Sequence, residues 1–268
     1  MMFIATLLLI QACSFALWLT SLRIKNVSIV DIFWGLGFAL VTFFCSIGLS
    51  RSIFGADLPT PSWPQWLLTG MVVAWGVRLG GYLFLRNHGK PEDYRYAAMR
   101  EHWGGKFTLR SLYTVFLLQG SLIWFISLPV QCALVGQTVD TLRCGLGFSI
   151  WAVGLFFESI GDWQMYSFKK NPDNKGKVMN RGLWRFTRHP NYFGDFMVWW
   201  GLYIFSAQPE SWWWTILSPL LMSILLLRVS GVSLLESSLK NRLEGYEQYI
   251  RNTNSFFPWF PKSRGERG

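Results

Sequence analysis

Long apolar runs separated by short polar stretches occupy this chain from its first residues to about residue 234. Seven of these runs approach the length needed to cross about 30 Å of hydrocarbon at about 1.5 Å per helical residue. The expected spans are 3–22, 27–49, 64–85, 111–137, 142–165, 191–207 and 211–234. The pattern therefore predicts an all-α, polytopic integral membrane protein.

Composition agrees with membrane embedding. The 268 residues are 51% hydrophobic and only 15% charged, so polar side chains are too few to cover a soluble globule. The first run lacks a basic flank and an A-x-A cleavage pattern, so we expect a transmembrane helix there and no signal peptide. The four cysteines lack metal-ligand spacing and there are only three histidines, so no metal site is expected.

The basic residues predict an orientation. All of the 25 Lys and Arg except Arg51, Arg78 and Arg143 lie toward one side of the predicted bundle. The positive-inside rule places that side in the cytoplasm, with the N-terminus outside and the C-terminus inside. We expect a bacterial inner membrane, with the net charge of +10 explained by topology and anionic headgroups. No nucleic-acid partner and no obligate protein partner are expected.

Ionisable side chains inside the predicted spans are functional candidates, because a charge in a bilayer is costly. They all fall in the half of the bundle near the basic loops, which indicates a polar chamber open to the cytoplasm. The set is Asp31, Arg78, Glu158, Asp162, Asp195 and, just past the last span, Glu236. Glu158, Asp162 and Tyr166 follow one another at intervals of four and share a helix face. The alternative is that Arg78 pairs with Asp31 or Asp162 only to hold the bundle together.

The stretch RFTRHPNYFGD, residues 185–195, stands where the sixth span begins. Pro190 suits the first turn of a helix, and the free N–H groups of a helix N-terminus favour an anion. The surrounding cations are Lys169, Lys170, Lys175, Lys177, Arg181, Arg185 and Arg188. We expect an anion site for the phosphates of a partly apolar ligand, with Asn191 and Asp195 taking hydroxyls or an amide. Positive-inside charge alone would explain the lysines, but it does not explain this polar pair.

Three segments carry a resemblance. NRGLWRFTRHPNYFGDF resembles the C-terminal signature of the membrane reductases related to steroid 5α-reductase and the sterol C14-reductases. The tail ESSLKNRLEGYEQYIRNTNSFFPWFP and the turn RNHGKPEDY are similar to the same superfamily. The similarity is strongest over about 155–261, and the chain most resembles the bacterial branch described as a domain of unknown function, DUF1295.

The resemblance implies NADPH-dependent reduction of a carbonyl-conjugated C=C bond in a hydrophobic, lipid or steroid-like substrate. We expect one membrane domain over 1–268, in which 1–137 shapes the substrate cavity and 142–261 binds the cofactor. The residues assigned to cofactor binding are Lys90, Glu158, Asp162, Lys169, Arg181, Arg185, Arg188, His189, Asn191, Tyr192, Asp195, Glu236 and Tyr246. Asp31 and Tyr82 are the catalytic candidates, as donors to the substrate carbonyl. No G-x-G-x-x-G motif follows a strand, so the helices and their loops would hold the dinucleotide.

Two other functions stay open. Membrane methyltransferases of the isoprenylcysteine carboxyl type also carry an Arg-His-Pro-x-Tyr stretch, and they use S-adenosylmethionine. The tail of this chain has a single glutamate, Glu236, where the methyltransferases usually have a pair of glutamates. The segment Asn191–Asp195, which ends the Arg-His-Pro stretch, resembles the reductases more than the methyltransferases. A non-catalytic lipid-binding or transport protein is the third possibility, although we see no inverted repeats. Apolar residues at helical spacing from about 235 to 250 predict an amphipathic helix along the cytoplasmic face.

Overall fold

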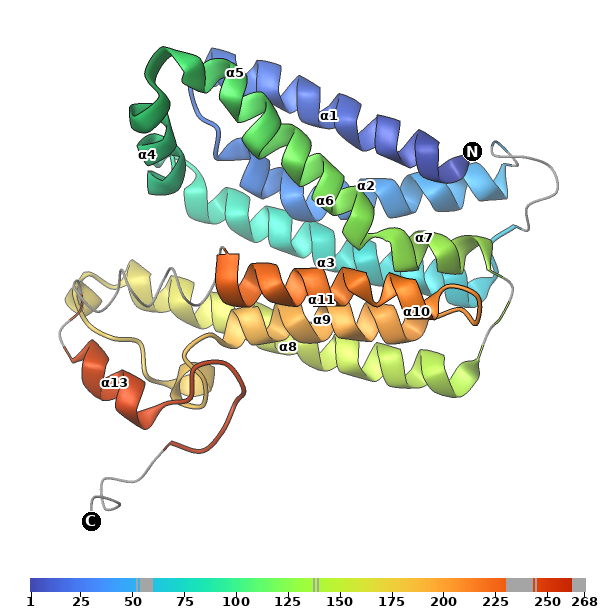
Figure 1. Ribbon diagram of the computed structural model, residues 1–268. Helices are drawn as coiled ribbons and strands as arrows, with labels where there is room; N and C mark the ends of the chain where they lie inside the picture. The colour runs from blue at the N-terminus through green and yellow to red at the C-terminus, as the bar shows by residue number, and fades with distance from the viewer. Residues whose placement is uncertain are drawn as a thin grey trace. The chain divides into compact units, whose positions relative to one another are not determined.

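Helices make up the fold (Figure 1), as the sequence predicted. A computed structural model describes residues 1–51, 53, 60–136, 138, 140–229, 243 and 245–261. Within these ranges no strand is present. The predicted tail helix at 235–250 lies mostly outside them, as does Glu236; its last part is described, and α13 (Tyr246–Asn252) is helical there.

Five helical segments are long and apolar enough to cross a membrane, which is consistent with an integral membrane protein. They are α1 (Met2–Ile24), α2 (Ile29–Ser50), α3 (Trp63–Asn87), the segment Tyr94–Ile126 and α8 (Thr141–Lys170). The last two predicted runs are also helical, as α9 (Pro190–Ser206) and the apolar segment Trp212–Arg228. With 17 residues, α9 reaches about 25 Å, which is shorter than a typical span. The described residues thus hold five spanning candidates, and the expected count of seven stays a prediction.

The helices form two compact units, each of which we describe by itself. The first unit comprises Met1–Asp140 and Ser206–Ser218. Besides α1, α2 and α3 it contains α4 (Tyr94–Trp103), α5 (Phe107–Ser111), the π-helical turn Leu112–Leu117, α6 (Leu118–Ile126), α7 (Leu128–Val135) and α10 (Trp212–Thr215). Helices α2 and α3 lie side by side (Figure 1), and a Cβ on Gly35 would lie only 2.7 Å from the carbonyl oxygen of Gly76. Glycine therefore sets the close approach of these two helices.

The second unit comprises Thr141–Phe205 and the described residues from Pro219 onward. It contains α8, α9, most of α11 (Leu217–Ile224), the π-helical turn Leu225–Val229, α13 and two 3₁₀ turns, Pro172–Asn174 and Gly182–Arg185. Helices α8 and α9 run antiparallel and almost backbone to backbone. A Cβ on Gly154 would lie 2.5 Å from the amide nitrogen of Val198, and one on Gly147 would lie 2.5 Å from that of Phe205. This tight pair carries the buried carboxylates that the sequence singled out.

Candidate functional site

Among the described residues of the second unit, three carboxylates are buried: Glu158 and Asp162 on α8, and Asp195 on α9. The side-chain amide of Asn191 donates to Oδ1 of Asp162 over 3.1 Å, so a polar link joins α8 to the first turn of α9. Among the residues that the structure describes, no group of three or more His, Cys, Asp or Glu could hold a metal ion. The structure thus brings Asp162 and Asn191 together, two residues that the sequence assigned to one ligand.

The Arg-His-Pro stretch is positioned by the loop that precedes it. Pro190 is the first residue of α9, as its restricted φ predicts. The indole N–H of Trp184 donates to the carbonyl of Gly161 over 3.0 Å, which attaches the loop to α8. His189 is buried and stacks on Tyr192, with ring centroids 5.7 Å apart and an interplanar angle of 23°. The start of α9 therefore has a defined geometry.

Arg188 attaches the C-terminal tail to this stretch. Its guanidinium donates to the carbonyl of Ile250 over 3.0 Å and also to that of Thr253. Its backbone N–H donates to the carbonyl of Asn254 over 2.9 Å. The sequence predicts that Arg188 binds the cofactor. In the structure Arg188 holds the tail against the start of α9, and a phosphate contact stays a prediction.

A basic pocket of about 700 Å³ lies in the second unit, between the loop after α8 and the helix α13. Among the residues that the structure describes, its cations are Lys175, Lys177 and Arg185, and no acidic residue lines it. The other lining residues are Gly176, Val178, Asn180, Gly245, Gln248, Tyr249, Asn252, Thr253 and Pro261. Three cations with neighbouring amide and hydroxyl groups form a lining that suits a phosphate-bearing ligand.

Two segments about 65 residues apart build this pocket, and Tyr249 joins them. Its hydroxyl donates to the carbonyl of Trp184, across a sequence separation of 65 residues. The cations of the first segment are predictable from the sequence, but the polar residues of the second are not, because no local pattern shows which loop a tail helix will pack on. Lys169 and Arg181, which it also assigned to the cofactor, are exposed and lie outside the pocket lining. Tyr246 is buried on α13, with its ring 5.9 Å from that of Tyr249.

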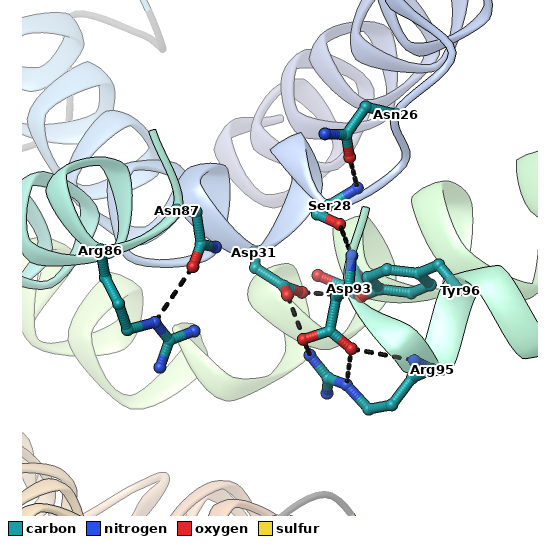
Figure 2. Close-up of polar contacts among 9 residues, drawn as sticks. Asn26, Ser28, Asp31, Arg86, Asn87, Asp93, Arg95 and Tyr96 are labelled. Atoms are coloured by element: carbon teal, nitrogen blue, oxygen red, sulfur yellow. Dashed lines mark hydrogen bonds and ion pairs between the residues drawn. The ribbon is translucent and has the colours of Figure 1, made fainter. Parts of the chain in front are cut away.

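In the first unit, Asp31 is the centre of a polar network (Figure 2). Its Oδ1 accepts from the hydroxyl of Tyr96 over 2.6 Å, and its Oδ2 accepts from the guanidinium of Arg95 over 2.9 Å. Arg95 also donates to Oδ1 of Asp93 over 2.8 Å, and the Asp93 N–H donates to the hydroxyl of Ser28 over 2.7 Å. Both carboxylate oxygens of Asp31 thus accept hydrogen bonds, so Asp31 could act as a proton donor only after these hydrogen bonds break.

Glu92 connects the same loop to the start of α2. It accepts from the backbone N–H of Val27 over 2.7 Å and from the guanidinium of Arg100 over 2.8 Å. Burial works against ionisation of this carboxyl, but the hydrogen bonds from Arg100 and Val27 outweigh it and hold the pKa of Glu92 below its ordinary value. Burial alone would raise the pKa of Asp93, but the hydrogen bonds and charge of Arg95, together with the charge of Arg86, hold that pKa below its ordinary value. The sequence did not identify Arg95, Tyr96 and Arg100 as the partners of the carboxylates at positions 31, 92 and 93.

The remaining candidates of the first unit lie on and after α3. The guanidinium carbons of Arg78 and Arg86 lie 5.7 Å and 5.8 Å from the centre of the Tyr82 ring. Lys90 is exposed in the loop that follows α3. Tyr82 therefore stands between two cations on one helix face, as their spacing of four residues predicts.

The chain is similar in sequence to a described family and to several known proteins. Residues 17–253 match the family described as "Protein of unknown function (DUF1295)", which confirms the resemblance drawn from the sequence. A 64-residue stretch is 44% identical to "Probable O-methyltransferase ustE" of Ustilaginoidea virens, covering 24% of this chain and 22% of that protein. Over 229 residues the chain is 26% identical to "Uncharacterized protein C594.04c" of Schizosaccharomyces pombe, covering 76% and 64% of the two chains.

A third relative is "Uncharacterized protein C9.08c" of Schizosaccharomyces pombe, 29% identical over 112 residues, or 35% of this chain and 39% of that one. The matched regions thus span between 22% and 64% of the length of these relatives. No solved structure matches the chain at a significant level.

Proposed function

The chain belongs to the DUF1295 family, and we propose that it is a membrane-embedded enzyme that uses NADPH to reduce a C=C bond conjugated to a carbonyl group. The substrate would be a lipid or steroid-like molecule that reaches the site from the bilayer. The observation that carries this proposal is the basic pocket of the second unit, in a chain whose Arg-His-Pro signature resembles that of the membrane reductases.

The lining of the basic pocket fits the anionic part of a dinucleotide. Arg and Lys bind phosphate oxygens through charge-assisted hydrogen bonds, and the pocket supplies Lys175, Lys177 and Arg185. Amides such as those of Gln248 and Asn252 can take hydroxyl or base groups. A volume of about 700 Å³ lies within the range of about 300–1,000 Å³ that is usual for cofactor sites.

The linked pair Asp162 and Asn191 is our candidate for holding ribose hydroxyls or the carboxamide, since it offers acceptor and donor groups in a partly buried place. When bound, NADPH would supply the hydride. Charge then develops on the substrate carbonyl oxygen, which needs a donor aimed at it. We prefer Tyr82 over Asp31 for this role, because both oxygens of Asp31 already accept hydrogen bonds. The basic side of the bundle would face the cytoplasm, where NADPH is made.

The test is a thermal-shift titration of the detergent-purified full chain with NADPH, NADH and S-adenosylmethionine. A ligand that binds only the folded state, at 100 times its Kd, adds about 2.7 kcal/mol to the free energy of unfolding. We expect this from NADPH, and we expect the double variant Lys177→Gln, Arg185→Gln to lose it. The matched control is Lys170→Gln, Arg181→Gln, which removes the same charges from exposed positions outside the pocket lining. Equal stabilisation of both double variants would refute the pocket assignment.

One observation favours a second function, methyl transfer from S-adenosylmethionine: the 44% identity over 64 residues to a protein named a probable O-methyltransferase. S-adenosylmethionine carries no phosphate, so its binding should survive the Lys177→Gln, Arg185→Gln change. Stabilisation by S-adenosylmethionine and none by NADPH would therefore replace the reductase proposal by this one.

A further inference from the structure

A cluster of large aromatic side chains is exposed near the end of the second unit. Phe257, Trp259 and Phe260 are 63%, 69% and 77% exposed, in the segment 256–260 that we name the aromatic loop. These rings lie beyond the last apolar helix that the structure describes, so the described spanning helices do not by themselves account for their exposure.

The backbone of the aromatic loop is held in place. The hydroxyl of Thr187 donates to the carbonyl of Phe256 over 2.8 Å, and the N–H of Trp259 donates to the carbonyl of Phe186 over 2.9 Å. Pro258 and Pro261 further restrict the chain. The loop is therefore pinned to residues directly before α9, and its rings project from an ordered scaffold.

Contacts between aromatic rings also show how far from the N-terminus of α9 the aromatic loop lies. Phe256 packs on Phe193 and Phe196 with centroids 6.0 Å and 5.5 Å apart, and Phe257 lies 6.0 Å from both. These partners stand three and six residues after Pro190, or about 5 Å and 9 Å along the helix. If α9 enters the membrane at Pro190, as the sequence predicts, the loop lies at the depth of about 5–10 Å to which interfacial apolar groups are buried at the boundary between headgroups and acyl chains.

The residues around the aromatic loop suit the interfacial layer of a membrane. Trp and other amphipathic aromatic residues concentrate at membrane–water interfaces. Pro261, directly after the loop, lines the basic pocket with its three cations, and Arg251 and Lys262 flank the segment in the sequence. Cations next to inserted rings are attracted to anionic headgroups. A protein partner could also cover exposed rings, but the level along α9 and the adjoining cations favour lipid.

We propose that the aromatic loop inserts into the interfacial layer of a phospholipid bilayer with anionic headgroups, and so fastens the C-terminal tail to the membrane surface. Because the backbone of the loop is already ordered, insertion costs little conformational entropy. The tail that it fastens includes α13, which forms one wall of the basic pocket. This inference does not depend on which cofactor the pocket binds.

The test uses the unmodified full chain in nanodiscs of zwitterionic and anionic phospholipid that contain a lipid with a photoreactive group near its glycerol. Trypsin separates the segment 252–262, which holds the loop, from the neighbouring segment 243–251, which serves as the internal control. We expect lipid adducts on 252–262 to be at least several-fold more frequent than on 243–251. Equal or lower labelling of 252–262 would overturn the proposal.

A second measurement distinguishes lipid from protein as the covering partner. A fluorophore is attached at Trp259→Cys, with exposed Glu247→Cys as control, in a background whose four native cysteines are replaced. We expect lipid-borne nitroxide to quench the probe at 259 and aqueous iodide to quench the probe at 247. Quenching at 259 by iodide alone overturns the proposal, and so does shielding from both quenchers, because the loop would then be covered by protein.

Discussion

Tyr96 donates a hydrogen bond of 2.6 Å to Asp31 across 65 residues of sequence, and thereby joins the first turn of α4 to the first turn of α2. Arg95, the neighbour of Tyr96, pairs with the other oxygen of Asp31. A carboxylate in the first turn of a helix is also favoured by the helix dipole. The network therefore holds the loop between α3 and α4 in place.

Replacing Tyr96 by Phe should destabilise the protein. The change removes a donor to Oδ1 of the mostly buried carboxylate of Asp31, and hydrogen bonds to charged groups contribute about 1.5–3 kcal/mol. Thermal unfolding in detergent measures the effect, with Tyr94→Phe as control because Tyr94 is 57% exposed on the same helix. Equal melting temperatures for the two variants would mean that the Tyr96 hydroxyl contributes nothing.

Glu92 should make stability depend on pH in the acidic range. Its pKa is lowered in the folded state, since the hydrogen bonds from Arg100 and Val27 outweigh burial, so the ionised form stabilises the fold above the ordinary value of 4.5. That contribution is lost as the pH falls through the lower folded pKa. We expect Glu92→Gln to melt below the wild type at neutral pH and the difference to shrink in acid. A difference that stays constant with pH, or that exposed Glu101→Gln reproduces, would contradict this.

Gly194 should not tolerate a larger side chain. A Cβ there would overlap the backbone nitrogen of Glu158 on the facing helix and lie 2.6 Å from the carbonyl oxygen of Gly154. Overpacking of this kind costs about 1–3 kcal/mol, so Gly194→Ala should lower the melting temperature. A Cβ added at Gly145 on α8 would have no atom within 4 Å, so Gly145→Ala should be neutral or slightly stabilising. If both variants melt alike, the two helices do not pack as described.

Arg188→Lys should loosen the tail without unfolding the second unit. Lysine keeps the charge but cannot donate to the carbonyls of Ile250 and Thr253 with the planar geometry of a guanidinium. We expect trypsin to cleave after Arg251 about tenfold faster, which corresponds to about 1.4 kcal/mol of lost tail docking. Arg185→Lys, on the same loop but exposed, is the control and should leave the cleavage rate unchanged.

Much of the helical architecture was predictable because apolar runs of this length have few alternatives. Each predicted span is helical over most of the part that the structure describes, with a few non-helical residues such as 27–28, 127 and 216 inside the predicted bounds, and Pro190 begins α9. The sequence also assigned Asp162 and Asn191 to one ligand, and the structure joins these two side chains by a hydrogen bond. Lys169 and Arg181 were assigned to the same ligand as Arg185, but only Arg185 lines the basic pocket, since charge along a loop does not reveal which side chains face inward.

The sequence by itself determined that the chain is a helical membrane protein with its cations concentrated near particular helix ends, because hydrophobic length and charge are properties of consecutive residues. Only the tertiary structure decided that Asp31 binds Arg95 and Tyr96, and that α13 completes the basic pocket. Both depend on segments about 65 residues apart in sequence. Which of them meet is settled by close packing, such as that at Gly35 and Gly154, and by the need of each buried polar group for a partner.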